Sequence, residues 1–136
     1  MNIFLDACVI SYIIEAKEPF YSNVQKTLFN IVNENPDTSI AISRLSIIEC
    51  LVQPLRQQQT FTIEQYRSFF ARQDLHIVEL TSGVVEKALW LRVNYNLRTP
   101  DALQAASALE LTSTGMVFLT GDKTFTKVPE LNVKTL

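Results

Sequence analysis

The segment NIFLDACVI, residues 2–10, decides the fold class of this chain. Its first part, Asn2–Leu5, is a short apolar run that ends at Asp6, a pattern typical of a strand buried on both faces. Val9–Glu15 then predicts a short helix. Because strands buried on both faces occur in parallel sheets covered by helices, this beginning favours an α/β fold.

The rest of the chain repeats the alternation of short apolar runs and helical periodicity. Further strands are expected at residues 39–42, 75–80, 116–119 and 132–136. Two helices are expected at residues 20–33 and 62–73. Three more are expected to begin at a capping residue: one from Ser43 to near Pro54, one from Thr81 or Ser82 to about 94, and one from Thr99 to about 113. In the fourth of these helices, we expect Leu89, Trp90, Leu91 and Val93 to pack in the core. The order predicts a parallel sheet covered by helices on both faces.

Composition limits the possible classes of protein. A chain of 136 residues with 47% hydrophobic and 19% charged residues predicts a single folded domain over residues 1–136 and excludes the disordered class. Two cysteines 42 positions apart and one histidine exclude zinc-finger, iron–sulfur and disulfide-scaffold proteins. No segment reads as a signal peptide or a membrane span, so we expect no membrane association, a cytoplasmic location and two free thiols.

Four acidic residues fall where an open parallel sheet binds its ligands, beyond the carboxyl ends of the strands. Asp6 follows the first strand, Glu49 lies in the helix after the second, Asp101 begins a later helix, and Asp122 follows the fourth strand. Each has a simpler structural explanation as a cap, a solvated helix residue, a helix-dipole partner or a turn residue. Their joint placement at one edge is what indicates a site.

Clustered carboxylates repel one another unless a cation neutralises them, and hard oxygen ligands select Mg²⁺ or Mn²⁺. Such a cleft suits metal-assisted phosphodiester chemistry. Without metal, repulsion is expected to raise the pKa of at least one of the four carboxyls. On that basis, replacing Asp122 by Asn is expected to stabilise the metal-free protein at pH 7.

The chain resembles PIN-domain nucleases, and among them the VapC-type ribonuclease toxins. The resemblance lies in four segments: IFLDACVI (3–10), SIAISRLSIIECL (39–51), LRTPDALQAASALEL (97–111) and VFLTGDKTF (117–125). It implies a three-layer α/β/α sandwich with a central parallel sheet of strand order 3-2-1-4-5. It also implies a metal-dependent endoribonuclease in which Asp6, Glu49, Asp101 and Asp122 hold one or two Mg²⁺ or Mn²⁺ ions. The implied role is the toxin of a type II toxin–antitoxin pair, with an RNA substrate, a small antitoxin partner and a homodimeric state.

Other residues of the matching segments are supporting candidates. Thr120 matches a hydroxyl position beside the acidic cluster, although a strand-end role explains it equally well. Ser46 lies one helical turn before Glu49, so both can face the cleft, unless it is simply solvated. The resemblance places a Ser or Thr where this chain has Cys8, a weaker hydrogen-bonding group.

Basic residues near these segments are candidates for contact with an RNA backbone. The net charge is −2, but outside the four acidic candidates the chain carries a small positive excess. The matching segments are flanked by four basic residues that can contact phosphates: Arg44, Arg56, Arg98 and Lys123. Taken singly, each is better explained as an ordinary solvated charge.

Two alternative functions remain open at this point. The first is a PIN-like module that binds RNA or protein without cutting, which the loss of a carboxylate would favour. The second is a phosphatase or phosphotransfer domain of similar sheet order. The latter is disfavoured because no second aspartate stands at Cys8 and no phospho-acceptor aspartate follows the third strand.

Overall fold

A computed structural model describes residues 1–136 and contains one five-stranded sheet. All neighbouring strands pair in parallel, and their order is β3-β2-β1-β4-β5. This confirms the predicted parallel sheet and its strand order. The strands are β1 (Asn2–Leu5), β2 (Ser39–Ser43), β3 (Leu75–Val78), β4 (Met116–Thr120) and β5 (Val133–Thr135).

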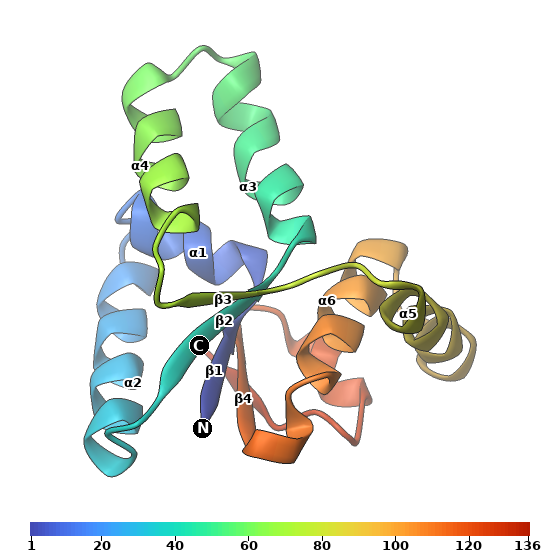
Figure 1. The fold of residues 1–136 in the computed structure, drawn as a ribbon. Helices are drawn as coiled ribbons and strands as arrows, with labels where there is room; N and C mark the ends of the chain where they lie inside the picture. Colours follow the sequence, from blue (N-terminus) through green and yellow to red (C-terminus); the bar gives the residue numbers. More distant parts are fainter.

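Helices cover both faces of the sheet and complete the α/β/α sandwich (Figure 1). One face carries α1 (Ala7–Ile14), α2 (Phe20–Glu34), α3 (Leu45–Arg56) and α4 (Thr60–Phe70). The other carries α5 (Ser82–Tyr95), α6 (Thr99–Leu109) and the 3₁₀ helix η2 (Lys123–Lys127); a second 3₁₀ turn, η1 (Thr112–Thr114), precedes β4. Helices α3 and α4 form a hairpin that projects from the body of the molecule (Figure 1).

The central strand shows why the sheet is buried on both sides. Alternate side chains of a strand point to opposite faces. Ile3 and Leu5 therefore join the core under α1–α4, whereas Phe4 joins the core under α5 and α6 and stacks on Phe118 of β4. Ile3, Phe4 and Leu5 are each at most 1% exposed, as expected for a strand at the centre of a covered sheet.

Some predicted helix boundaries were wrong and others were confirmed. Helix α3 ends at Arg56, near Pro54 as predicted; a proline in the last turn removes one backbone hydrogen bond without ending the helix at once. Thr99 is the first residue of α6 rather than its cap, and its hydroxyl accepts a hydrogen bond from Arg92 (2.7 Å). The predicted cap at Thr81 is confirmed, since its Oγ1 accepts from the Val84 N–H at 3.2 Å.

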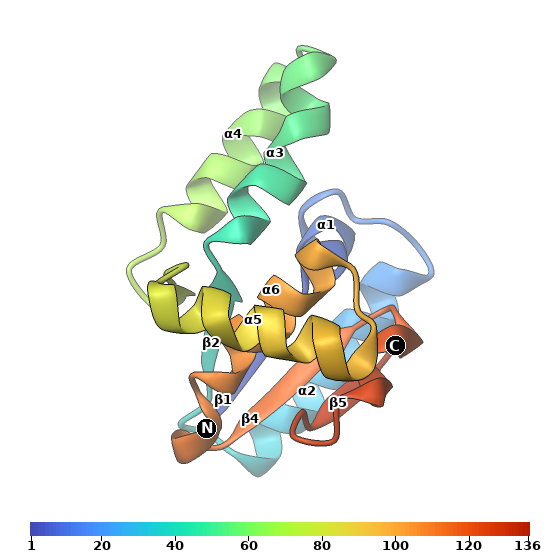
Figure 2. The ribbon, with the colours of Figure 1, turned by 90° about the vertical axis from the view of Figure 1, so that its right-hand side faces the viewer.

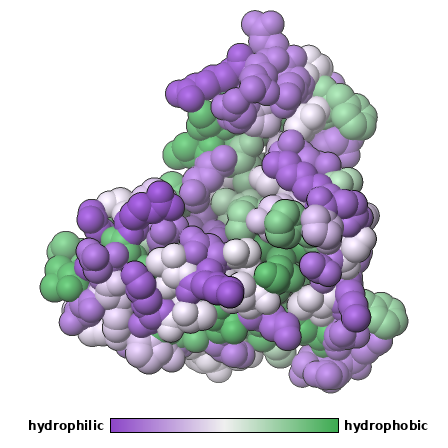
Figure 3. All heavy atoms as spheres, turned by 180° about the vertical axis from the view of Figure 1, so that it is seen from behind, coloured by the Kyte–Doolittle hydropathy of each residue, from purple (hydrophilic) through white to green (hydrophobic).

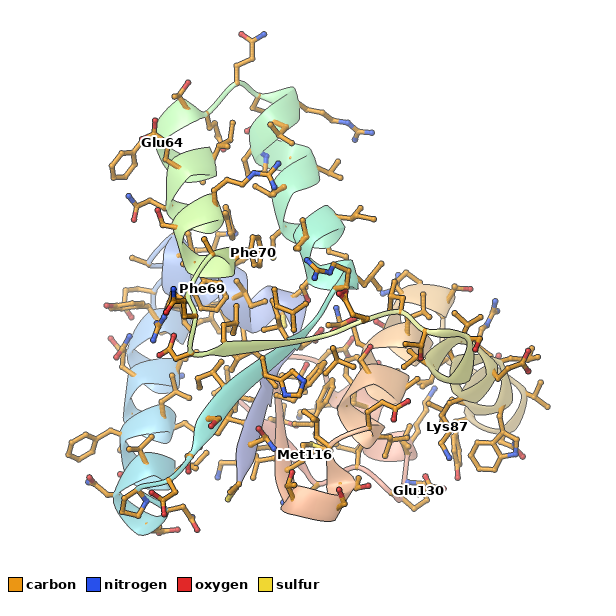
Figure 4. The ribbon with its side chains drawn as sticks, viewed as in Figure 1. Glu64, Phe69, Phe70, Lys87, Met116 and Glu130 are labelled. Atoms are coloured by element: carbon orange, nitrogen blue, oxygen red, sulfur yellow. The ribbon has the colours of Figure 1, made fainter.

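Core packing of residues 89–93 was also predicted wrongly. Only Leu91 is buried, whereas Leu89, Trp90 and Val93 are 58%, 44% and 76% exposed. Neighbouring positions of a helix point around its whole circumference, so four residues in this short stretch cannot all face the core. The Lys87 ammonium instead lies 4.9 Å from the centre of the exposed Trp90 ring; Figure 4 labels Lys87 on α5.

The surface is a mosaic of hydrophilic and hydrophobic side chains, with a mostly hydrophilic tip on the projecting hairpin (Figure 3). At the end of α4, the rings of Phe69 and Phe70 lie edge to face to one another, and both pack against the core under α1–α4 (Figure 4). None of the helices is long and apolar enough to cross a membrane. Both cysteines, Cys8 and Cys50, are free thiols, as predicted.

Candidate active site

The site is built where α1, α3 and α6 meet beyond the carboxyl ends of the central strands (Figure 2). Strand β1 delivers Asp6 there, β4 delivers Thr120, and the beginnings of α3 and α6 deliver Glu49 and Asp101. Alanines Ala102, Ala105, Ala106 and Ala108 are almost fully buried and let α6 approach the sheet closely. The sheet edge predicted from the sequence is therefore where the structure brings these side chains.

Asp6 is the buried centre of the arrangement, with 8% of the residue exposed. Its Oδ1 accepts from the Ala7 N–H at 2.8 Å and so caps α1. Its Oδ2 accepts from the Thr120 hydroxyl at 2.8 Å and from the Cys8 thiol at 3.4 Å. Burial raises the pKa of Asp6 in spite of these hydrogen bonds, and the charge of Asp101 adds to the shift.

Thr120 connects two of the predicted acidic residues. It is fully buried, donates to Asp6, and accepts from the Asp122 N–H at 3.0 Å. Cys8 lies beside it and accepts from the Gly121 N–H at 3.4 Å. Burial, helped by the charge of Asp6, raises the pKa of Cys8 to about 11, so this group stays a neutral thiol at pH 7. Thr120 and Cys8 therefore both act on the Asp6 carboxylate directly.

Glu49 and Asp101 complete a group of three interacting carboxylates. Partial burial of the Glu49 carboxyl raises its pKa, and the charges of Asp6 and Asp101 raise it further. The Asp101 side chain is 15% exposed and lies 3.4 Å from the Nε of Arg98. Arg98 is itself 81% exposed, so it neutralises the group only from the solvent side.

Asp122 lies at the same sheet edge, but its carboxylate has a local partner. Its Oδ1 accepts from the Thr124 N–H at 2.9 Å and caps η2. Hydrogen bonds from Thr124 lower the pKa of Asp122, and the charges of Arg98 and Lys127 lower it further. These contacts favour the opposite of the expectation that removing this charge stabilises the metal-free protein, because repulsion and burial act on Asp6 and Glu49 instead.

The donors fit a hard divalent cation by their chemistry. They are carboxylate oxygens, two of them have raised pKa values, and no buried Lys or Arg neutralises them. However, no three His, Cys, Asp or Glu side chains are close enough together to form a ready-made metal centre. The residues that would hold a metal are thus assembled at one edge without being gathered around one point.

Ser46 and Gln104 form a buried polar contact beside Glu49. The Gln104 amide nitrogen donates to the Ser46 hydroxyl at 2.9 Å and to Glu49 Oε1 at 2.7 Å. Ser46 is fully buried, so it is not simply solvated, and it reaches Glu49 only through Gln104. Sequence reasoning missed Gln104. The available signal was one long amide among the alanines of a helix, one turn after Asp101.

The basic candidates differ in how they are held. Arg44 is engaged in a two-pronged pair with Glu79, with Nη2 2.7 Å from Oε2. Arg98 and Lys123 are exposed near Asp101 and Asp122. Arg56 is the last residue of α3, about two turns beyond Glu49.

Comparison with known proteins identifies the family. The model of the PIN domain family matches residues 3–131. The chain belongs to the PIN domain family. The comparison with curated proteins found no match.

Solved structures share this PIN fold over nearly their whole length. VapBC2 from Rickettsia felis, bound to a DNA fragment from its promoter, is 18% identical, covers 99% of this chain and 98% of its own, and has a TM-score of 0.74. A toxin–antitoxin complex from Klebsiella pneumoniae is 20% identical, with coverages of 98% and 96% and a TM-score of 0.68. The sarcin–ricin loop cleaving toxin VapC20 from Mycobacterium tuberculosis is 12% identical, with coverages of 85% and 86% and a TM-score of 0.65. At these identities the likeness concerns the fold.

Proposed function

We propose that this protein is a metal-dependent endoribonuclease that cleaves RNA phosphodiester bonds. One observation carries the proposal: Asp6 is buried at the sheet edge with no buried Lys or Arg beside it, the charge of Asp101 acts on it, and both charges act on Glu49. A protein that keeps uncompensated carboxylates together destabilises itself unless they bind something positive. Membership of the PIN family supports the nuclease assignment.

The proposed roles follow from the contacts of each side chain. Asp6 and Asp101 are the central ligands for one or two Mg²⁺ or Mn²⁺ ions, and Glu49 and Asp122 stand beside them. When bound, such an ion activates water and stabilises the negative charge that develops on the phosphodiester. Thr120 holds Asp6 Oδ2 in place through its 2.8 Å hydrogen bond. The exposed Arg98 and Lys123 bind phosphates of the RNA backbone.

The proposed biological role is that of a toxin held in check by a small antitoxin protein, with the toxin itself a homodimer. Similar folds are found in toxin–antitoxin complexes from Klebsiella pneumoniae and in VapBC2 from Rickettsia felis. The role predicts a short reading frame beside the gene that encodes a DNA-binding protein. Co-expression of that protein should restore the growth of cells in which this chain alone arrests growth.

Asp6→Asn and Asp101→Asn test the catalytic proposal. Each replacement is nearly isosteric but removes a charged metal ligand, so each should abolish RNA cleavage in Mg²⁺ or Mn²⁺ while the circular dichroism spectrum stays native. Asp37→Asn, at an exposed loop position, is the matched control and should cleave like the wild type. Wild-type cleavage in EDTA, or full activity of either site variant, would overturn the assignment.

The competing function is a PIN module that binds RNA or protein without cutting. It predicts no cleavage with either metal, and RNA binding that is unchanged by Asp6→Asn. A binding titration on the same variants therefore separates the two functions.

A further inference from the structure

Gln104 is a buried side chain that links the two helices carrying Glu49 and Asp101. It is 1% exposed and stands on α6 one turn after Asp101. Each proton of its amide nitrogen has an acceptor on α3, Ser46 Oγ at 2.9 Å and Glu49 Oε1 at 2.7 Å. Because a carboxylate only accepts hydrogen bonds, the amide must present its nitrogen to Glu49.

This contact leaves the amide oxygen unsatisfied. Gln104 Oε1 is buried and is the one buried side-chain polar atom without a hydrogen-bond partner in the structure. An unpartnered buried acceptor is destabilising. An aliphatic side chain of similar size, placed beside the buried Ala102, Ala105 and Ala106, would have no such acceptor. Stability alone therefore does not explain an amide here.

Holding α6 against the rest of the site does not explain it either. One turn further along α6, the Ser107 hydroxyl bonds to Ser43 Oγ at 2.9 Å and ties α6 to β2. What Gln104 adds is a direct hydrogen bond to one oxygen of Glu49. The other oxygen, Oε2, has no hydrogen bond within the chain and remains available to a ligand.

We propose that Gln104 is a positioning residue that fixes the Glu49 carboxylate from the neighbouring helix, with Ser46 holding the Gln104 amide in place. The inference rests on the proposed metal-dependent function. Partners that orient metal ligands typically change metal affinity by about 10–100-fold when removed. Gln104 would thus tune how strongly the site binds its ion.

The experiment compares Mn²⁺ affinity and thermal stability in five proteins: wild type, Gln104→Leu, Ser107→Ala, Glu49→Gln and the double variant of Gln104→Leu with Glu49→Gln. Calorimetric titration without RNA should show about tenfold weaker Mn²⁺ binding for Gln104→Leu. Ser107→Ala, the matched control for the other buried link, should lose melting temperature and keep its Mn²⁺ affinity. The double variant of Gln104→Leu with Glu49→Gln should bind Mn²⁺ no more weakly than Glu49→Gln alone. Glu49→Gln already removes the carboxylate through which Gln104 acts, so the second change has nothing left to affect.

Unchanged Mn²⁺ affinity in Gln104→Leu, or a further loss in the double variant, would overturn the inference. If the wild type binds no Mn²⁺, the proposed function fails, and Gln104 is then judged from the carboxyl ¹³C NMR signal of Glu49 at pH 7. That signal should shift in Gln104→Leu and stay in place in Ser107→Ala. An unshifted signal in Gln104→Leu rejects the positioning role.

Discussion

Asp122 is one of the four acidic residues near the carboxyl ends of the strands, and it also has a structural role in the turn that follows β4. Its carboxylate caps η2 through the Thr124 N–H, and its pKa is lowered by that partner. A carboxyl with a lowered folded-state pKa stabilises the protein above its unfolded pKa, and this contribution is lost as pH falls through the folded value. We therefore expect Asp122→Ala to destabilise the protein by about 1 kcal/mol at pH 7, the usual cost of losing a cap.

Denaturant unfolding at pH 7 and at pH 3 measures this effect. The loss in Asp122→Ala should shrink at the lower pH, and Asp122→Asn should lose less at pH 7 because an amide oxygen can still accept from Thr124. Stability equal to or above the wild type in Asp122→Ala would return Asp122 to the group of repelling carboxylates.

Asp6 behaves in the opposite way, because burial raises its pKa. Such a group binds more protons folded than unfolded, so its charge destabilises the metal-free protein at neutral pH, and the penalty fades as pH falls towards its unfolded value. Asp6→Asn keeps an acceptor for the Ala7 N–H and removes the charge. In EDTA we expect a higher melting temperature than wild type at pH 7 and a smaller gain at pH 5.

Thermal unfolding of Asp6→Asn beside Asp37→Asn checks this prediction. The control should show no gain at either pH, since Asp37 is exposed and forms no ion pair. A lower melting temperature for Asp6→Asn at pH 7 would mean that the hydrogen bonds to the ionised carboxylate outweigh the cost of burying it.

At the scale of elements, the alanines of α6 determine how near Asp101 comes to Asp6. Ala105 is fully buried against the sheet, so a larger residue there forces α6 outward. Ala105→Leu should destabilise the protein by about 1–3 kcal/mol and weaken Mn²⁺ binding by moving Asp101. Ala71→Leu, at an exposed position after α4, is the control and should change neither quantity. Wild-type Mn²⁺ affinity in a destabilised Ala105→Leu would separate the packing of α6 from the site.

The elements also show what the sequence could and could not predict. The strands were predictable because apolar runs such as Asn2–Leu5 are buried on both faces and carry no competing periodicity. The ends of the helices and the buried face of α5 were not predictable, because they depend on tertiary contacts. One such contact is the hydrogen bond from Arg92 of α5 to the Thr99 hydroxyl at the start of α6. Asp6 and Thr120 follow strands directly, so their meeting at the sheet edge was predictable. Gln104 was missed because its role exists only once α3 and α6 lie side by side.

For the whole molecule, the group of carboxylates formed by Asp6, Glu49 and Asp101 makes folding and ion binding interdependent. The α3 and α6 carboxylates come together only in the folded chain, so an ion bound there stabilises the folded state alone. Such an ion adds RT ln(1 + [L]/Kd) to the free energy of unfolding, about 2.7 kcal/mol at a hundredfold excess over Kd.

We expect Mn²⁺ to raise the melting temperature of the wild type and to raise that of Asp6→Asn much less, because the variant has already lost both the repulsion and a ligand. Ca²⁺ at equal ionic strength, which favours longer and more numerous oxygen contacts, serves as the comparison ion. A melting temperature that does not move with millimolar Mn²⁺ would instead favour a PIN module that works without metal, in which the carboxylates meet a basic partner.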